Sequence, residues 1–285
     1  MDVRFMSDEG IEQHPVEELA ALLARDDGLV WVDIPVCDEP AARVLSEVFG
    51  FHPLAIQACI ERNAVPRVRA YRDHVFVVLH APELGKGGHV HYVELDQFIG
   101  PRYLVSVHGP LNPAVTQEAS LRQTRGVLQR VEAGRLRPRS PFELSYAIVG
   151  SLAHRQGVQL ERLATEVAAL EQRVRGDLGD PVRVLEEMFL VRHELLSIRT
   201  IAAESGEVYT RMSALSRMIP PESPPLIQDL INRFERVRSM SDDEKEFAQG
   251  VIDFYQARTT TRMNIAMERL ALIAAVLLPV TAIAS

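Results

Sequence analysis

The amino-acid sequence predicts an α+β fold, in which an α/β module is followed by a long antiparallel helix pair and a stalk helix. Three observations carry this prediction. Short apolar runs rich in β-branched residues alternate with amphipathic segments over the first 110 residues. Apolar residues then recur at steps of three and four, and proline is absent between Leu226 and Pro279. We therefore expect three parts, at residues 1–138, 139–222 and 223–285.

The first strand and the first two helices of the module have distinct local patterns. LVWVDIP is a short apolar run with β-branched residues, which predicts a strand. PAARVLSEVFG is amphipathic and closed by Gly50, as a helix is when glycine follows its last turn. A second helix is expected in HPLAIQACIERNAVPRV, opened at His52-Pro53, because proline suits the first helical position.

Three further strands and a charged helix complete the module. The strands are expected in RAYRDHVFVVLHAPE, HVHYVELDQFIG and RYLVSVHG, with a hairpin turn at Gly85 to Gly88 between the first two. Residues 112–136 are charged and predict a helix that is interrupted by Gly126 and ends around Gly134 and Pro138.

Two long helices are predicted at about 141–175 and 182–218, joined by a turn at Gly176 to Pro181. Each has apolar residues spaced like the seam of a packed helix pair, so we expect antiparallel packing. The seam residues are Leu160, Leu163, Val167, Leu170 and Val174 in the first helix, and Val184, Met188, Val191, Leu195, Ile198 and Ala202 in the second.

The stalk helix should open after PPESPPL and continue for more than fifty residues. At 1.5 Å per residue it would be roughly 80 Å long, which exceeds the needs of a globular domain. A stalk that leaves the domain and enters a membrane explains this length. Three-helix packing in a soluble protein is the alternative.

The end of the stalk is the one long apolar segment of the chain. From Leu270 to Ala284 every residue is apolar except Thr281, whereas a bilayer needs about 20 such residues. A buried core helix could also carry such a run. The residues Asn264, Met267, Ala271, Ala274, Leu278 and Thr281 share one face, which predicts that this face meets copies of itself around a narrow pathway.

Composition limits the classes of function. The formal net charge of −8 and a pI near 5.6 argue against nucleic acid and against a polybasic lipid-binding surface, and favour cations. We find no catalytic signature, so neither enzymatic activity nor an organic cofactor is expected. Two cysteines, Cys37 and Cys59, fit reduced thiols in a cytosolic setting, and no signal peptide pattern opens the chain.

Two further clusters are weak candidates for metal binding. His80, His89 and His91 gather around the predicted hairpin, but no third ligand at a fixed spacing accompanies them, so we expect exposed histidines instead of a zinc site. The acidic run Asp242 to Glu246 on the stalk is expected to be a solvated helix face.

Several short motifs resemble those of the CorA family of magnesium channels. The motifs are Trp31-Val32-Asp33, Phe49-Gly50-Phe51-His52-Pro53-Leu54, Pro66-Arg67-Val68, Val105-Ser106-Val107-His108 and the junction MNIAMERLALIAAVLLPVTAIAS. In that family a Gly-Met-Asn signature and a second transmembrane helix follow, and glycine usually stands where this chain has Ser285. The resemblance implies a CorA-like cytosolic funnel with a truncated first transmembrane helix, and we expect the chain as given to be nearly soluble without forming a stable pentamer.

The resemblance also implies a function. The complete protein would be a homopentamer in the cell inner membrane, with residues 1 to about 265 cytoplasmic and the C-terminal region in the lipid bilayer. It would conduct Mg²⁺, with cobalt and nickel as further candidates, and Mg²⁺ would also regulate it. Asp253 and Glu83 would bind the regulatory ion between subunits. The pathway would be lined by Asn264, Met267, Leu270, Leu278 and Thr281.

Two alternatives stay open at this point. The zinc-transporting branch of the same superfamily shares the architecture. A soluble coiled-coil scaffold would instead bury the apolar tail as a core helix.

Overall fold

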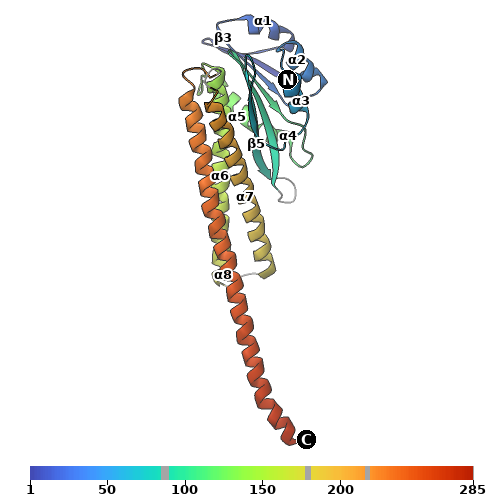
Figure 1. The fold of residues 1–285 in the computed structure, drawn as a ribbon, viewed down its shortest axis with the longest axis vertical. Helices are drawn as coiled ribbons and strands as arrows, with labels where there is room; N and C mark the ends of the chain where they lie inside the picture. Colours follow the sequence, from blue (N-terminus) through green and yellow to red (C-terminus); the bar gives the residue numbers. More distant parts are fainter. Residues whose placement is uncertain (85–89, 177–180, 216–218, 285) are drawn as a thin grey trace.

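A seven-stranded sheet and a three-helix bundle form the fold, and one helix of the bundle extends far beyond the other two (Figure 1). The computed structural model describes residues 1–84, 90–176, 181–215 and 219–284, with the backbone alone at 84, 181–182 and 276–284. This arrangement matches the predicted α+β class, with the α/β module first and the stalk helix last.

The strands form a mixed sheet in the order β2-β1-β3-β7-β6-β5-β4. Only β3 and β7 run parallel among the described pairs, with Asp33 opposite Ser106. The bounds are β1 Asp2–Ser7, β2 Gly10–His14, β3 Gly28–Ile34, β4 Arg67–Ala70, β5 Val75–Leu84, β6 Val90–Ile99 and β7 Tyr103–His108. The β1–β2 hairpin was not among the predicted strands. The predicted turn at 85–88 lies outside the described residues.

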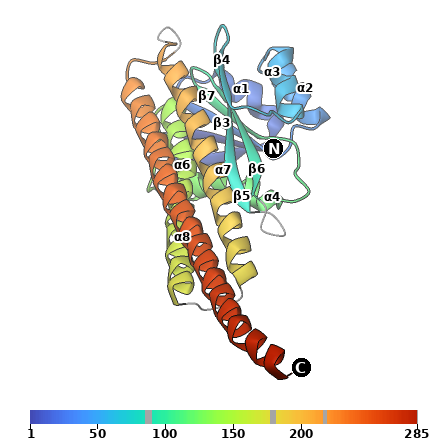
Figure 2. The same cartoon turned by 60° about the horizontal axis from the view of Figure 1, so that its bottom comes forward.

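Helices cover both faces of the sheet (Figures 1 and 2). Side chains of a strand alternate between faces, so Phe76 and Val78 pack toward the short helices while Val75 and Val77 pack toward the bundle. The short elements on the first face are the 3₁₀ helix η1 Val16–Glu18, α1 Leu19–Ala24, α2 Glu39–Glu47 and α3 Pro53–Ile60. The sheet is therefore buried on both sides.

The caps of α2 and α3 explain why these helices begin where they do. The Asp38 carboxylate accepts a hydrogen bond from the Ala41 amide at 3.0 Å, and His52 Nδ1 accepts one from the Leu54 amide at 3.1 Å. Such caps satisfy amides that lack a partner in the first turn. Gly50 has φ +65, which glycine adopts without strain. The predicted opening at His52-Pro53 and the stop at Gly50 are confirmed.

The charged segment after the sheet folds differently from the prediction. It forms α4 Gln117–Ser120 and α5 Arg122–Glu132, so the break lies at Leu121 and the prediction of a break at Gly126 is wrong. Glycine costs only about 1 kcal/mol in a helix interior, and the burial of the adjacent Val127 against the core outweighs that cost.

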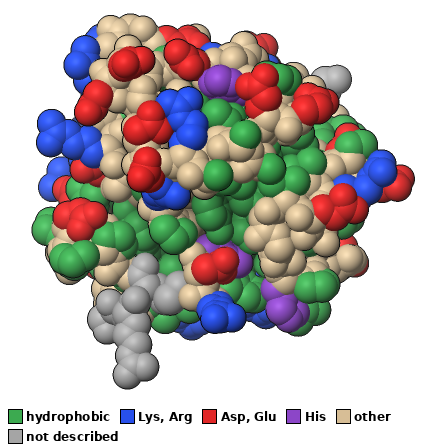
Figure 3. Space-filling view, turned by 90° about the horizontal axis from the view of Figure 1, so that it is seen from above, with side chains coloured by type: hydrophobic (Ala, Val, Ile, Leu, Met, Phe, Trp, Pro, Cys, Tyr) green, Lys and Arg blue, Asp and Glu red, His purple; other side chains and the backbone are tan. Residues whose placement is uncertain are grey.

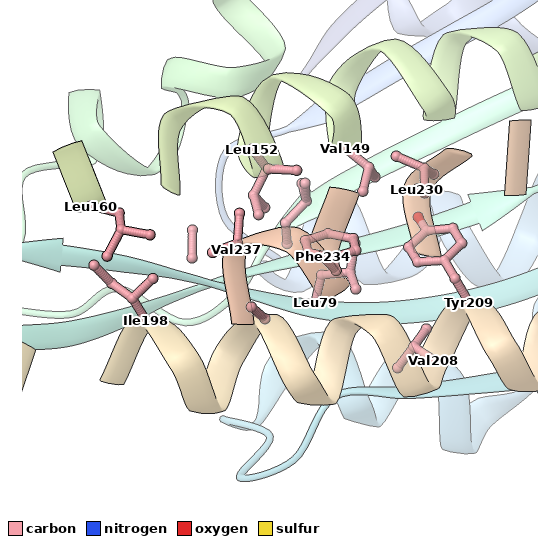
Figure 4. Packing of buried hydrophobic residues seen from close by; sticks show 14 of the residues in the cluster. Leu79, Val149, Leu152, Leu160, Ile198, Val208, Tyr209, Leu230, Phe234 and Val237 are labelled. Atoms are coloured by element: carbon pink, nitrogen blue, oxygen red, sulfur yellow. The ribbon is translucent and has the colours of Figure 1, made fainter. Parts of the chain in front are cut away.

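The bundle consists of α6 Pro141–Gly176, α7 Pro181–Ser213 and the first half of α8 Pro224–Ala284. Every seam residue predicted in the two long helices is buried. The seams also pack against α8, whose Leu230, Phe234 and Val237 lie between α6 and α7 (Figure 4). Ile227 of α8 belongs to the same core. The predicted helix pair is thus part of a three-helix arrangement, and α7 ends five residues earlier than expected, at Ser213.

The predicted length and continuity of the stalk helix are confirmed by α8, which has 61 residues in one continuous helix. At 1.5 Å per residue it is roughly 90 Å long. It is buried in the bundle at intervals from Ile227 to Ile252 and then leaves the bundle at the far end from its start. Pro279 does not end it, because the helix continues to Ala284.

Candidate ion pathway and cation-binding residues

The exposed half of α8 carries the residues predicted to line a pathway. From Thr259 to Ala275 every side chain is exposed. Asn264, Met267 and Leu270 follow one another at steps of three, so they lie on one side of the helix. Met267 is 55% exposed and Leu270 is 65% exposed. Leu278 and Thr281 belong to the same helix, but their side chains lie outside the described part of the chain.

Apolar residues also occupy the other sides of this half of α8. Ile265, Leu272 and Ile273 are exposed as well, and the charged residues Glu268 and Arg269 lie between them in the sequence. Apolar side chains that are exposed on several sides of a helix need protein or lipid around them. Within the described part of the chain, no helix has an 18-residue stretch apolar enough to span a membrane.

Asp253 and Glu83, the predicted cation ligands, lie in different environments. Asp253 is exposed on α8, where Gln249 Nε2 donates a hydrogen bond to it at 2.7 Å. Glu83 is buried near the end of β5, and its carboxylate pairs with Arg122 at 3.2 Å and with Arg155. Two arginines already neutralise Glu83, whereas Asp253 is open to a neighbour.

The acidic run on α8 is only partly a solvated face. Asp242 pairs with Arg199 of α7 at 2.8 Å and with Lys245 at 3.1 Å. This contact ties α8 to α7, while Asp243 and Glu246 are exposed. The prediction for this run therefore holds for the latter two residues and not for Asp242.

The motif residues Trp31, Asp33, Ser106 and His108 meet in one buried polar network between the sheet and α5. Parallel pairing of β3 with β7 brings them together, although they are far apart in the sequence. Ser106 Oγ donates to Asp33 Oδ1 at 2.5 Å, His108 Nε2 to the same oxygen at 2.9 Å, and Thr124 Oγ1 to Asp33 Oδ2 at 3.0 Å. Trp31 Nε1 donates to Ser106 Oγ at 3.0 Å.

The hydrogen bonds of this network stabilise the fold, and they do not have the arrangement that a nucleophilic serine requires. A serine nucleophile needs a hydrogen bond to a histidine base, but the Ser106 hydroxyl donates to Asp33 instead. Burial alone would raise the pKa of Asp33, but the charge of His108 and the hydrogen bonds from His108, Ser106 and Thr124 lower it. Asp33 therefore stabilises the fold at neutral pH, and this stability is lost as the pH falls through its lowered pKa.

A pocket of about 360 Å³ lies on the other side of the sheet. Glu94 and His80, both buried, are among its lining residues, and Glu94 Oε2 accepts a hydrogen bond from the Asn63 amide at 2.8 Å. His80 Nε2 lies 3.8 Å from Glu94 Oε2, and its ring stacks on Tyr92 with centroids 5.8 Å apart. The expectation of exposed hairpin histidines is therefore wrong for His80, because Tyr92 covers it.

The other thiol and histidine predictions have mixed outcomes. Cys37 and Cys59 are both free and buried, as predicted. Burial raises the pKa of the Cys37 thiol to about 11, so it is protonated at neutral pH. His89 lies outside the described residues. Within the described ranges, no three His, Cys, Asp or Glu residues form a group that could hold a metal ion.

Asp96 is a fully buried carboxyl that the sequence analysis missed. Neither of its oxygens has a hydrogen-bond partner in the described structure. Burial and the negative charge of Glu94 raise the pKa of Asp96 well above its ordinary value. The alternation of Glu94 and Asp96 with the apolar residues Val93 and Leu95 was the available signal, because residues two apart share a face.

The raised pKa of Asp96 predicts a pH dependence of stability. The folded chain keeps a proton on Asp96 that the unfolded chain releases, so stability is full below the ordinary pKa of about 4 and declines as the pH rises above it. We expect Asp96→Asn to remove part of this decline and to be more stable than the unmodified chain at pH 8 by about 1 kcal/mol. Urea unfolding across the pH range measures this effect.

Asp243→Asn is the matched control for Asp96→Asn, because Asp243 is exposed. Its pH profile should follow that of the unmodified chain. Parallel profiles for Asp96→Asn and the unmodified chain would mean that Asp96 is ionised in the folded state.

The sequence pattern of one protein family, described as CorA-like Mg2+ transporter protein, matches residues 26–285. The chain is 23% identical over 257 residues to YfjQ of Bacillus subtilis (strain 168). It is 24% identical over 249 residues to the cobalt/magnesium transport protein CorA of Thermotoga maritima. The alignments cover 89% and 84% of this chain, and they span 76% and 66% of the two relatives.

Solved structures share the fold at low sequence identity. The full-length CmaX protein superimposes with a TM-score of 0.83 at 20% identity, covering 99% of this chain and 84% of that one. The complete CorA magnesium transporter of Methanocaldococcus jannaschii gives 0.79 at 16% identity, covering 96% and 82%. The ZntB cytoplasmic domain of Vibrio parahaemolyticus gives 0.69 at 11% identity, covering 92% and 98%. These likenesses concern the fold alone.

Proposed function

We propose that this chain, which belongs to the CorA-like Mg2+ transporter family, forms the cytosolic part and the beginning of the ion pathway of a Mg²⁺ channel. Proteins of this family transport divalent cations and are not enzymes. Residues 1 to about 265 would lie in the cytoplasm, and α8 would enter the inner membrane below them. Copies of α8 would surround the pathway.

The exposed half of α8 is the single observation that carries this proposal. The helix leaves the bundle and exposes apolar residues on several sides, while Asn264 introduces one amide on the predicted pathway face. Met267 and Leu270 on the same face would form an apolar constriction, and Leu278 and Thr281 would continue the lining. An amide and a hydroxyl suit hydrated Mg²⁺, which loses its water reluctantly.

The part of α8 that precedes the proposed pathway has an exposed face that could contact a neighbouring copy of this chain. Met240, Phe247 and Phe254 recur every seven residues there and are 40%, 45% and 51% exposed. Gly250 and Ala257 lie beside them, and a Cβ at Gly250 would meet open space. Small residues next to exposed aromatics allow another helix to approach closely. We propose a homopentamer in which these residues of adjacent subunits meet.

Zinc is the second candidate substrate. The ZntB cytoplasmic domain shares the fold of this chain, so the architecture alone does not favour one cation. Magnesium is favoured because carboxylate, amide and hydroxyl oxygens are hard ligands, whereas zinc prefers cysteine and histidine. No cysteine or histidine is present in the sequence after Asp253.

Asp253 is proposed to bind regulatory Mg²⁺ between subunits. Its exposed carboxylate could meet a neighbour, and Mg²⁺ would relieve the repulsion between chains of formal charge −8. Glu83 would bind the same ion only if its ion pairs with Arg122 and Arg155 were broken. We expect millimolar Mg²⁺ to protect the stalk of the natural full-length protein against proteolysis, and Asp253→Ala to weaken that protection. Potassium at equal ionic strength should protect little.

Glu186→Ala is the control, because it removes an exposed carboxylate from α7. Unchanged magnesium protection in Asp253→Ala would remove this residue from the mechanism. The regulatory ion would then have to be sought at Asp243 and Glu246.

A further inference from the structure

Arg258 makes an unusual contact at the level where α8 leaves the bundle. Its Nη1 donates to the carbonyl oxygen of Val174 at 2.5 Å and to that of Arg175 at 2.8 Å. These are carbonyls of the last turn of α6, which ends at Gly176. The last four carbonyls of a helix have no partner within it and carry partial negative charge. Arg258 therefore caps α6 from another helix.

The contact lies at a boundary in the packing of α8. Val251 and Ile252 are buried in the bundle, and Tyr255 is partly buried against it. From Thr259 to Ala275 every side chain is exposed. Arg258 thus joins α8 to α6 one turn below the end of the apolar packing, where no buried apolar residue of α8 holds the two helices together.

The position along α8 suggests what the contact does. Asp253 lies five residues above Arg258, which is roughly 7.5 Å along the axis, and Asn264 lies six residues below, roughly 9 Å. Because α8 is one continuous helix, the angle at which it leaves the bundle determines the position of its residues after Arg258. A contact at the exit point controls this angle more directly than the packing near Ile227 does.

We propose that Arg258 is a positioning residue that fixes the exit angle of the stalk against the C-terminal end of α6, and so couples cation binding on the bundle to the pathway-lining part of α8. The inference rests on the proposed function. Two charge-assisted hydrogen bonds from one guanidinium hold α6 and α8 in a defined relation, because both acceptors belong to one rigid helix end. Without them, α8 below Tyr255 can pivot relative to α6.

Three variants of the natural full-length protein test the role. R258M keeps the length of the side chain and its helix propensity but removes the donors. R258K keeps the charge and can still donate to helix-end carbonyls. R236M removes an exposed arginine from the bundled part of the same helix and is the control.

The first measurement is the distance between spin labels at Gln172 and Thr260, which are both exposed. In assemblies with one labelled subunit, the unmodified protein, R236M and R258K should give one narrow distribution, whereas R258M should give a clearly broader one. An unchanged distribution in R258M would overturn the inference, because it would mean that other contacts fix the exit angle.

The second measurement is the Mg²⁺ concentration that half-inhibits cation uptake into lipid vesicles. We expect R258M to raise it about 5- to 10-fold, in the usual range of coupling between sites, with uptake at low Mg²⁺ retained. R258K should restore most of the response. A purely structural role would reduce the amount of active protein without moving this concentration, so an unchanged concentration would overturn the inference.

The two measurements separate this inference from the function on which it rests. If the unmodified protein took up no divalent cation, the proposed function would fail, and the coupling role of Arg258 would fail with it. The spin-label distances would still decide whether Arg258 fixes the exit angle.

Discussion

Replacing Leu195 or Leu163 with alanine is expected to lower the free energy of unfolding by about 2–5 kcal/mol. Both side chains have no exposed surface, and they lie in the core that α6, α7 and α8 share. Truncation removes buried methyl groups and leaves a cavity that the three long helices can close only by shifting along their length. Thermal and urea unfolding measure the loss.

Leu196→Ala is the matched control, because Leu196 follows Leu195 in the same helix but is 46% exposed. It should change stability by less than about 0.5 kcal/mol. A loss below that value at both Leu163 and Leu195 would mean that these residues do not form the core of the bundle.

Replacing Asp33 with alanine is expected to cost about 3 kcal/mol. The change removes the acceptor of three hydrogen bonds, and leaves the groups of His108, Ser106 and Thr124 without that partner. His108 and Ser106 are 1% and 0% exposed, so water does not readily replace the carboxylate. Urea unfolding at pH 7 measures the effect.

The size of the Asp33 effect should depend on pH. Because the folded state lowers the pKa of Asp33, its contribution is present at neutral pH and lost in acid. The difference between Asp33→Ala and the unmodified chain should therefore shrink as the pH falls below about 4. A constant difference would indicate that the carboxylate charge contributes nothing.

Helix positions were more predictable from the sequence than helix partners. The seam residues of α6 and α7 were all identified correctly, because apolar spacing reports which side of a helix is buried. The same spacing does not say what covers that side. Phe234 and Val237 of α8 share the core with both seams, and their contribution could not be read from the seams alone.

The short elements at the N-terminus were missed for a different reason. In β1, Val3 and Phe5 face the short helices, while Met6 lies with Asp2 and Arg4 on the side that faces the bundle, so two apolar residues follow one another at Phe5 and Met6. Strict alternation is then absent, and a short apolar run can belong to several kinds of element. The pairing of β1 with β3 decides the structure.

The polar sites depended even more on tertiary pairing. Trp31, Asp33, Ser106 and His108 were singled out as motif residues, but only the parallel register of β3 and β7 brings them into one network. The arginines around Glu83 and the contact of Arg258 with α6 join segments that no local pattern links. Such contacts require the packed helices to be in place.

Figure 3 shows one face of the molecule, on which acidic side chains do not form a continuous negative patch. Seen from above, acidic and basic side chains are interspersed around a central area of apolar side chains (Figure 3). A nucleic-acid surface would need clustered positive charge.

Cation uptake by the natural full-length protein in lipid vesicles tests the central claim, that copies of α8 line a divalent-cation pathway. A magnesium-sensitive dye inside the vesicles reports the flux. The unmodified protein should take up Mg²⁺, and Asn264→Ala should reduce the rate at least about tenfold, because the amide on the pathway face is lost. Ile265→Ala, an exposed change on another side of the helix, should leave the rate within about twofold. Equal rates for Asn264→Ala and the unmodified protein, or no uptake of any divalent cation, would contradict the account.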